Sequence, residues 1–564
     1  MKAVHPRKEP ALSVFPRPAL VGLPSDRTTT REIASSAATT LSAVLVLFAL
    51  LAPKDLDGLT PEAFARLPVE ALLGVAVVLM LRDGARRIVA VSAGAVLGVL
   101  TVVKAIDIGF GLALNRRFDP VFDWGVLGNG VDLLGTSIGQ AGAIASFAGL
   151  TLLAMVVIVL MALAVLRLSR VVAGRRTTST KVTAVLSVLW MVCAVSGAQL
   201  APGQPFASRS AVAFAYEDLR QVRAGIRDRD AFAEEVAVDA FRDTPPSGLL
   251  NALRGKDVLF TFVESYGRVA VQDSDIAPKV DAVLDAGTAR LKNAGYGSRS
   301  AFLTSPTTSA GSWLAHSTFQ SGVWVDSQHR YDDFVQTDRF TLGGAFKRAG
   351  WETVGVVPAH TEDWPEGKIY GYDRYYDSRG IGYRGPPFSY ATMPDQFTLS
   401  AFQRAERARP DRPPLMAEID LVTSHWPWTP LPRLVDWTAV GDGSIYNPMP
   451  SQGKTPEEVF TDPAKVRGAY GDSIAYSLNS LISYVETYGD DDLVLVFLGD
   501  HQPNPIVAGA GADRDVPITV VTRDKAVLDK ITGWNWQDGL NPDRNAPVWR
   551  MDAFRDRFLT TFAH

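Results

Sequence analysis

The chain contains 564 residues, more than one ordinary domain needs, and carries a formal net charge of −4. This balance argues against the basic character of a general nucleic-acid-binding protein, so we expect no nucleic-acid partner. The single cysteine, Cys193, excludes an intrachain disulfide. Long apolar runs lie in about the first 200 residues, whereas all but one of the seven histidines lie beyond residue 300. The composition therefore predicts a membrane part followed by a soluble part that carries the chemistry.

An all-α transmembrane domain is predicted over residues 33–201, after a basic tail of residues 1–32. Each strong segment reaches the length of about 20 apolar residues that spans a bilayer. The third segment carries Lys104 and Asp107, which could pair one helical turn apart or lie at the outer membrane interface. The predicted segments are residues 33–52, 67–81, 88–114, 141–166 and 182–201.

Basic side chains cluster in the N-terminal tail, after the second apolar segment and after the fourth. With five spans, all three clusters lie on one side of the membrane, and the positive-inside rule assigns that side to the cytoplasm. A count of four spans would break this pattern. We therefore expect a multi-pass protein of the cell membrane with a cytoplasmic N-terminus and an extracytoplasmic C-terminal domain.

Residues 202–250 are interpreted as a linker, and residues 251–564 as an extracytoplasmic domain. Within that domain, apolar runs alternate with helical segments, which predicts a mainly parallel sheet covered by helices. The predicted strands are residues 257–263, 353–357, 415–422, 493–498 and 516–521. The predicted helices are residues 281–293, 313–320, 342–349, 473–487 and 551–562, with a further helix at 211–236 in the linker.

Four chemically active side chains directly follow predicted strands: Glu264, His425, Asp500 and His501. Residues just past the carboxyl ends of parallel strands form the ligand sites of open α/β sheets, so one crevice could collect all four. A cation held by Glu264, Asp500 and His501 would have oxygen and nitrogen ligands, a set that suits manganese, magnesium or zinc. The alternative is a surface turn with a capping Asp500 and a solvated His501.

A hydroxyl-rich stretch, TSPTTSAGS at residues 304–312, precedes the predicted helix at 313–320. A hydroxyl at a helix N-terminus could coordinate the cation, lose its proton and become a nucleophile. The helix amides would favour an anionic substrate there. Ordinary helix capping by serine and threonine is the alternative explanation.

The order of these motifs resembles the alkaline phosphatase superfamily. Within it, the similarity is to the sulfatase-like branch that includes lipoteichoic acid synthases and phosphoglycerol or phosphoethanolamine transferases. The motifs are VES with Glu264, TTSAG at residues 307–311, SHWP with His425, and the pair Asp500–His501. The resemblance covers about residues 30–525 and includes the multi-span anchor. It implies an α/β sulfatase-like domain with a mainly parallel central sheet.

The resemblance also implies roles for individual residues. Thr308, in a Thr-x-Ala-Gly pattern, matches the nucleophile, and Trp364 matches a substrate-contacting tryptophan. His425 matches a catalytic histidine near the transferred group, where it would hydrogen-bond that group or help to protonate the leaving oxygen. Trp364 precedes Pro and Glu where lipoteichoic acid synthases have Trp-Asn-Arg, so the resemblance does not point to a glycerol-phosphate substrate. The implied ligands of one divalent ion, Mn²⁺ first and Mg²⁺ or Zn²⁺ as alternatives, are Glu264, Thr308, Asp500 and His501.

Several assignments stay open at this stage. The other candidate nucleophiles are Thr304, Thr307 and Ser309, and three histidines could line the site or serve structural roles: His316, His329 and His360. A formylglycine sulfatase is disfavoured because Thr304 stands where that family needs cysteine or serine.

The expected function is that of a metal-dependent phosphotransferase or phosphodiesterase with a phosphothreonine intermediate. Its expected substrate is a membrane lipid, a lipid-linked molecule or an envelope polymer, with a cell-envelope acceptor. The alternatives are a sulfatase-like hydrolase of phosphate or sulfate esters, a non-catalytic envelope scaffold, and a transporter.

Overall fold

A computed structural model describes residues 26–53, 58–114, 117–121, 123–124, 128, 139–201, 204–273 and 275–564. The chain divides into two compact units. The first comprises Met1–Ala105 and Ile138–Tyr216, and the second comprises Ile106–Ser137 and Glu217–His564.

Every apolar segment predicted from the sequence is a helix. Four helices are long and apolar enough to cross a membrane, over Thr30–Leu51, Asp83–Gly111, Gln140–Gly174 and Arg176–Ser196. The remaining helix, α3, has 12 residues, which span about 18 Å against about 30 Å for a hydrocarbon core. Four of the five predicted spans are therefore helices of membrane-spanning length, whereas the second is a helix too short to cross a bilayer along its axis. Their bounds are α1 (Asp26–Leu51), α3 (Val69–Met80), α4 (Asp83–Leu114), α6 (Gln140–Gly174) and α7 (Arg176–Ser196).

Small residues let α4 and α6 approach closely within the first unit. A Cβ atom at Gly94 would lie 2.6 Å from the Cα of Ala162, and one at Gly98 would lie 2.7 Å from the Cα of Ile158. Glycine is therefore required for this helix contact, as is common where helices pack in membranes.

Lys104 and Asp107 do not pair with each other. The Lys104 ammonium donates to the carbonyls of Ala49 and Ala52 near the end of α1, at 3.2 and 3.1 Å. These carbonyls lack partners within their own helix, so a lysine there is favourable. Asp107 accepts from the backbone N–H of Phe118 at 2.9 Å.

The second unit contains a nine-stranded sheet with the order β12-β6-β11-β10-β5-β9-β7-β8, and β13 adds to β6. Strands β10, β5, β9, β7 and β8 are parallel, whereas β11 is antiparallel to both β10 and β6. The mainly parallel sheet is confirmed, and all five predicted strands are present. The bounds are β5 (Asp257–Val263), β6 (Gly297–Thr304), β7 (Glu352–Val357), β8 (Arg374–Asp377), β9 (Leu415–Leu421), β10 (Leu493–Gly499), β11 (Asp515–Thr522), β12 (Gln537–Asp538) and β13 (Val548–Arg550).

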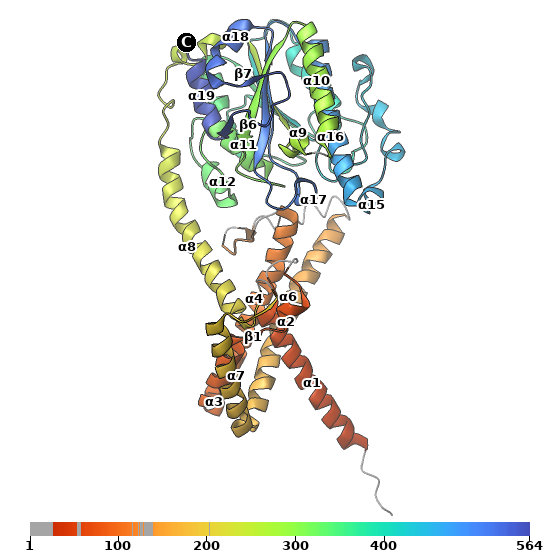
Figure 1. Cartoon of the computed structure of the whole chain (residues 1–564). Coiled ribbons are helices and arrows are strands. Elements are labelled where there is room, and N and C mark those ends of the chain that lie inside the picture. Colours follow the sequence, from red (N-terminus) through yellow and green to blue (C-terminus); the bar gives the residue numbers. More distant parts are fainter. Residues whose placement is uncertain are drawn as a thin grey trace, which may run out of the picture. The chain divides into compact units, whose positions relative to one another are not determined.

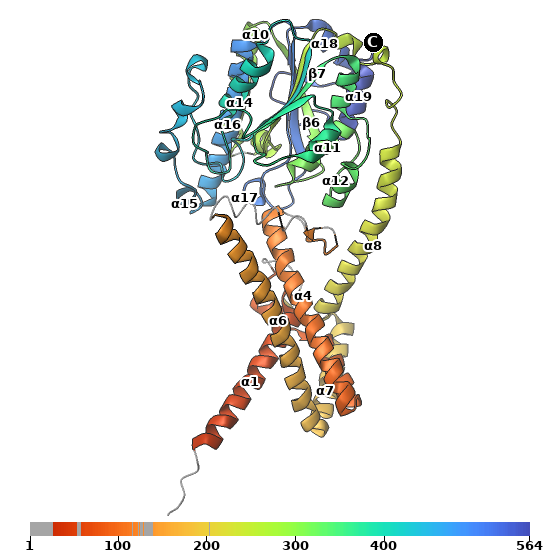
Figure 2. The ribbon, with the colours of Figure 1, turned by 180° about the vertical axis from the view of Figure 1, so that it is seen from behind.

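Helices cover both faces of this sheet (Figures 1 and 2). Helices α10 (Ala277–Asn293), α14 (Asp395–Phe402) and α16 (Pro463–Tyr488) contribute to one hydrophobic cluster. Helices α11 (Ser312–Ser321), α13 (Leu342–Ala349) and α19 (Ala553–Thr561) contribute to the other. All seven residues of β5 and of β10 are buried, which explains their uninterrupted apolar sequence.

The second half of the predicted linker packs on the second unit. Helix α8 (Ser210–Ala237) is present as predicted, and Phe232 and Val236 near its end are buried in a hydrophobic cluster. Beyond it, Asp239 is enclosed by two buried guanidinium groups, with Arg555 at 2.9 Å and Arg339 at 3.2 Å. These contacts attach the chain firmly before β5 begins.

Candidate metal centre

Three neighbouring parallel strands end at one edge of the sheet and bring the predicted residues together. The register pairs Gly499 of β10 with Val263 of β5. Asp500 and Glu264 follow these two residues directly, so they emerge side by side. The hydroxyl of Ser424, just after β9, donates to the backbone carbonyl of Glu264 at 2.6 Å and fixes the third strand end to the same edge.

Glu264, Asp500 and His501 form a compact cluster whose potential ligand atoms all lie within 4.8 Å of one another. The His501 Nε2 atom lies 3.6 Å from a Glu264 oxygen and 3.5 Å from an Asp500 oxygen. His501 donates from Nδ1 to the carbonyl of Gln502 at 2.9 Å, which leaves Nε2 toward the carboxylates. Asp500 is oriented by the N–H groups of Ser265 and His501, both at 2.7 Å.

The electrostatics of this cluster fit a cation. Burial, reinforced by the charge of Glu264, raises the pKa of Asp500 to about 6. Two carboxylates held this close repel each other unless positive charge lies between them. Carboxylate oxygens and a neutral imidazole nitrogen are ligands of Mn²⁺, Zn²⁺ and related ions. The donor set therefore fits one divalent ion.

Two hydroxyls contact this cluster: the Ser265 hydroxyl donates to a Glu264 oxygen at 2.7 Å, and the other belongs to Ser312, the first residue of α11. Its Oγ atom donates to Glu264 at 3.2 Å and lies 3.3 Å from His501 Nε2. Gly311 precedes the helix in the left-handed conformation with φ 82°, which glycine adopts without a Cβ clash. The N–H of Ser309 donates to the carbonyl of Gln502 at 2.8 Å and ties the loop to the strand end.

The predicted role of Thr308 as the nucleophile stays a prediction. Over the described residues, no hydrogen bond joins its hydroxyl to Glu264, Asp500 or His501. The Thr304 hydroxyl donates to Asp515 at 2.7 Å.

The other hydroxyls of this loop make no hydrogen bond to the three cluster side chains in the described structure, although that of Ser305 donates to the backbone carbonyl of Asp500 at 2.6 Å. The Thr307 hydroxyl donates to the carbonyl of Ala310 at 2.6 Å, and the Ser309 hydroxyl is buried without a partner in the described structure. The sequence analysis missed Ser312. The signal was available, because Ser312 directly precedes the predicted helix and so is the hydroxyl nearest its N-terminus.

His425 lies within electrostatic range of the cluster, because the charges of His501 and Asp500 act on its pKa. Burial lowers that pKa to about 4, so the ring is neutral at neutral pH. Its Nδ1 donates to the carbonyl of Trp426 at 2.7 Å, and its ring stacks on Tyr390 with centroids 3.7 Å apart. The remaining nitrogen, Nε2, is therefore a hydrogen-bond acceptor.

Trp364 belongs to an aromatic group with His360 and Tyr370, at centroid distances of 4.7 and 5.4 Å. No contact recorded for the described residues brings Trp364 to Glu264, Asp500 or His501. Its predicted role in substrate contact stays a prediction. His329 lies elsewhere, in an ion pair with Asp228 at 3.0 Å.

A second group of potential ligands lies on α11 and β9 and comprises His316, Glu418 and Asp420. His316 Nδ1 lies 2.7 Å from a Glu418 oxygen and 3.7 Å from an Asp420 oxygen. Burial opposes the charged form of His316, but the two carboxylates raise its pKa to about 9. Sequence reasoning did not single out Glu418 or Asp420, because both lie inside a predicted strand.

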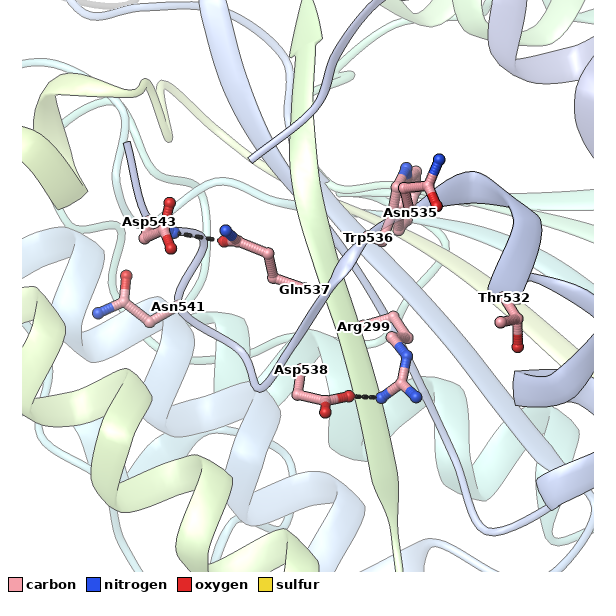
Figure 3. A pocket seen from close by; sticks show the side chains of 8 residues that line it. All are labelled: Arg299, Thr532, Asn535, Trp536, Gln537, Asp538, Asn541 and Asp543. Atoms are coloured by element: carbon pink, nitrogen blue, oxygen red, sulfur yellow. Dashed lines mark hydrogen bonds and ion pairs between the residues drawn. The ribbon is translucent and has the colours of Figure 1, made fainter. Parts of the chain in front are cut away.

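A separate cavity of about 560 Å³ opens around the start of β6 and the segment that leads into β12 (Figure 3). Arg299 and Asp538 form an ion pair across it. The cavity shares no residue with either cluster. Its lining consists of Arg299, Thr532, Asn535, Trp536, Gln537, Asp538, Asn541 and Asp543.

Comparison with protein-family models and with curated proteins finds no match. Among solved structures, the chain is similar to the lipoteichoic acid synthase LtaP from Listeria monocytogenes, with TM-score 0.37 and 13% identity over 59% of this chain and 78% of that one. It is also similar to the phosphoglycerol transferase GacH from Streptococcus pyogenes, with TM-score 0.35 and 12% identity over 60% and 79%. A third similar structure is the soluble domain of lipooligosaccharide phosphoethanolamine transferase A from Neisseria meningitidis, with TM-score 0.35 and 13% identity over 55% and 88%.

Proposed function

We propose that the chain is a membrane-anchored, metal-dependent phosphotransferase or phosphodiesterase of the cell envelope. The observation that carries the proposal is the contact of the Ser312 hydroxyl, at a helix N-terminus, with Glu264 and His501. A hydroxyl, two carboxylates and an imidazole at one point suit nucleophilic attack on a phosphoester. The substrate would be a membrane lipid, a lipid-linked molecule or an envelope polymer.

The cofactor would be one divalent ion held by Glu264, Asp500, His501 and the hydroxyl of the nucleophile. Mn²⁺ is expected first, with Mg²⁺ or Zn²⁺ as alternatives. When bound, such an ion supplies positive charge that lowers the pKa of a neighbouring hydroxyl and neutralises phosphoryl oxygens.

Ser312 would attack the phosphorus, so that a new Oγ–P bond forms while the bond to the leaving oxygen breaks. Its hydrogen bond to Glu264 offers the hydroxyl proton an acceptor, and the leaving oxygen takes a proton from solvent. The N-terminal amides of α11, a helix of 10 residues, favour the negative charge that gathers there. The product of this step is a phosphoserine intermediate.

An alcohol of the acceptor, or water, would then attack the same phosphorus and release Ser312. His425 suits the role of proton acceptor for that alcohol, because its Nε2 is unprotonated while Nδ1 donates to a carbonyl. His425 is therefore not proposed to protonate the leaving oxygen, because a neutral ring that donates from Nδ1 has no proton at Nε2. Trp364 is proposed to contact the substrate.

Thr308 is the alternative nucleophile, and its phosphothreonine would replace the phosphoserine. It rests on the motif resemblance, whereas Ser312 rests on contact with Glu264 and His501. The two proposals differ by four positions in one loop and are separable by peptide mass.

The membrane helices suit a lipid-linked donor, because they keep the domain on the same surface as its substrate. Four helices with the length and apolar character of spans tie the chain to the bilayer. Orientation depends on the short helix α3: only if it also crosses the membrane do the basic clusters share one side, which the positive-inside rule assigns to the cytoplasm. With that topology, the C-terminal domain would act outside the cytoplasm on a cell-envelope acceptor.

The test uses the full chain in detergent, loaded with Mn²⁺ and mixed with lipids that carry phosphoglycerol or phosphoethanolamine head groups. Rapid acid quenching and peptide mass spectrometry then locate any adduct. We expect it on Ser312, absent in Ser312→Ala and present in Thr308→Ala. An adduct on Thr308 would favour the alternative nucleophile. Lack of both an adduct and any released head group with every donor would contradict the proposed function.

A further inference from the structure

We propose that His316, Glu418 and Asp420 bind a second divalent cation beside the first. The inference deepens the proposed function, on which it rests for the first cation. The three potential ligand atoms lie within 4.8 Å of one another. They combine two carboxylate oxygens with an imidazole nitrogen, the same donor chemistry as in Glu264, Asp500 and His501.

The sheet places this second group next to the first. Phe262 of β5 pairs with Asp420 of β9, and Phe260 pairs with Glu418. Because side chains alternate along a strand, Phe260, Phe262 and Glu264 project to one face of the sheet. Glu264 lies two residues beyond the Phe262–Asp420 pair, a distance of about 7 Å along the strands. Two cations on this face would be neighbours.

Helix α11 closes both groups from above the same face. Phe260 and Phe262 pack with Phe319 of α11 at centroid distances of 5.6 and 5.3 Å. Ser312 and His316 lie one helical turn apart, on the same side of the helix. One helix therefore contributes Ser312 to the first group and His316 to the second.

The surroundings orient Glu418 and His316 as the outer neighbours of a metal site would. The Gln320 amide nitrogen donates to Oε2 of Glu418, and its oxygen accepts from the N–H of Gly343 at 2.9 Å. Oε1 of Glu418 is thereby left to face His316. The His316 ring lies on Phe262 with centroids 3.9 Å apart, so it cannot turn freely. Fixed ligand orientation of this kind raises metal affinity.

Asp420 supplies an independent indication. Its Oδ1 atom is buried and accepts no hydrogen bond in the described structure. A buried carboxylate oxygen without a donor is unfavourable. A cation between Asp420, Glu418 and His316 would satisfy it, and His316 would bind the cation as a neutral imidazole.

The charges agree with two cations. Four carboxylates lie in the two groups: Glu264, Asp500, Glu418 and Asp420. Across the described residues, no lysine or arginine forms an ion pair with any of them, and their ion-pair partners are histidines. With both imidazoles neutral, as metal ligation requires, the four carboxylates carry four negative charges, which two divalent ions would balance. Such a pair of ions would hold the nonbridging oxygens of a phosphoester from two sides.

The experiment counts Mn²⁺ bound to the full chain in detergent after removal of metal with a chelator, reloading and desalting. We expect two ions per chain, with an electron paramagnetic resonance spectrum broadened by coupling between them. Asp420→Asn and Glu418→Gln should each reduce the count to one and abolish the coupling. Asp420→Asn is the cleaner variant, because Oδ1 has no hydrogen bond to lose.

Asp228→Asn is the matched control, since Asp228 also contacts a histidine but has Arg330 as a partner. It should leave two ions bound. One ion per chain in the unmodified protein, unaffected by Asp420→Asn and Glu418→Gln, would overturn the second site and leave the proposed function intact. No bound ion in the unmodified protein would overturn the first site as well.

Discussion

Buried carboxylates occur in two regions of the second unit, and the two regions neutralise them differently. In the scaffold, Asp257 lies 3.1 Å from Arg407 and accepts from Arg412 at 2.7 Å. Asp239 lies 2.9 Å from Arg555. Each of these carboxylates is neutralised by an arginine of the protein itself, so no ligand is needed to balance its charge.

At the edge where β10, β5 and β9 end, the carboxylates have only histidines as ion-pair partners among the described residues. The consequence is visible in the pKa values. Burial raises the pKa of Asp500 to about 6, whereas Arg412 and Arg407 outweigh burial and lower the pKa of Asp257. The contrast indicates that Asp257 and Asp239 are neutralised by arginines of the scaffold, whereas the acids at this edge are free to neutralise a bound cation.

The largest expected effect is chemical and tests the edge region. Ser312→Ala should reduce head-group transfer by about 10⁴-fold or more, because it removes the proposed nucleophile. Thermal stability should change little, since Ser312 is partly exposed and its partners are site residues. A steady-state assay measures the effect, with Thr308→Ala as the control that keeps activity within about threefold. Loss of activity in Thr308→Ala, with activity kept in Ser312→Ala, would identify Thr308 as the nucleophile.

The next effect tests the scaffold. Asp239→Asn should destabilise the chain by about 3–5 kcal/mol, because it leaves Arg555 and Arg339 buried without their counter-charge. Bound manganese should be unchanged when the variant is folded. Thermal melting and metal analysis together check this. A loss of metal without a loss of stability would erase the distinction between the two regions.

A smaller effect is expected at His425. His425→Gln should slow transfer by about 10²-fold to 10³-fold, because the variant cannot take the acceptor's proton. His425→Asn should not restore the rate. Burial lowers the pKa of His425 to about 4, so this residue gains a proton only below that pH. Protonation of His425 should therefore not reduce the activity of the unmodified chain above pH of about 4. A variant with full activity would remove His425 from the mechanism.

The smallest effect concerns a scaffold acid without an arginine. Burial raises the pKa of Asp395 to about 6, above the unfolded value of about 3.9. Its protonated form contributes stability that is present below pH of about 4 and is lost as pH rises through 6. Asp395→Asn should therefore gain stability relative to the unmodified chain between pH 4 and 7, by at most about 2–3 kcal/mol.

Melting temperatures across this range measure the difference. Asp228→Asn should have the opposite effect and lower the stability of the chain in this pH range. Hydrogen bonds from Arg330 lower the pKa of Asp228 to about 2, so its stabilising effect is lost only as pH falls toward that value. Parallel pH curves for both variants and the unmodified chain would contradict the assigned pKa shifts.

Much of the scaffold was predictable because strands that are buried on both faces have uninterrupted apolar sequences. Strands β5 and β10 are buried on both faces, so their apolar runs match the observed bounds within one residue. Strand β6 was missed because its first half, from Gly297 to Ser300, contains no apolar side chain larger than glycine. Its place is set by pairing with β11, β12 and β13, which local periodicity does not reveal.

The site was predictable in part for a similar reason. Glu264, Asp500 and His501 follow strands directly, and the position of parallel strand ends is enough to gather them. The four-residue motif pointed to Thr308, whereas the proposal of Ser312 rests on the start of α11, whose exact position the sequence did not give. Glu418 and Asp420 lie within β9, so their role depends on which helix covers that face.

The most direct test of the account is an anomalous-scattering map from a crystal of the chain loaded with Mn²⁺. The account predicts a manganese peak enclosed by Glu264, Asp500 and His501, with the Ser312 oxygen at the coordination distance of about 2.0–2.3 Å. A peak coordinated by Thr308 in place of Ser312 would contradict the proposed nucleophile. No peak at this edge of the sheet would contradict the metal centre itself.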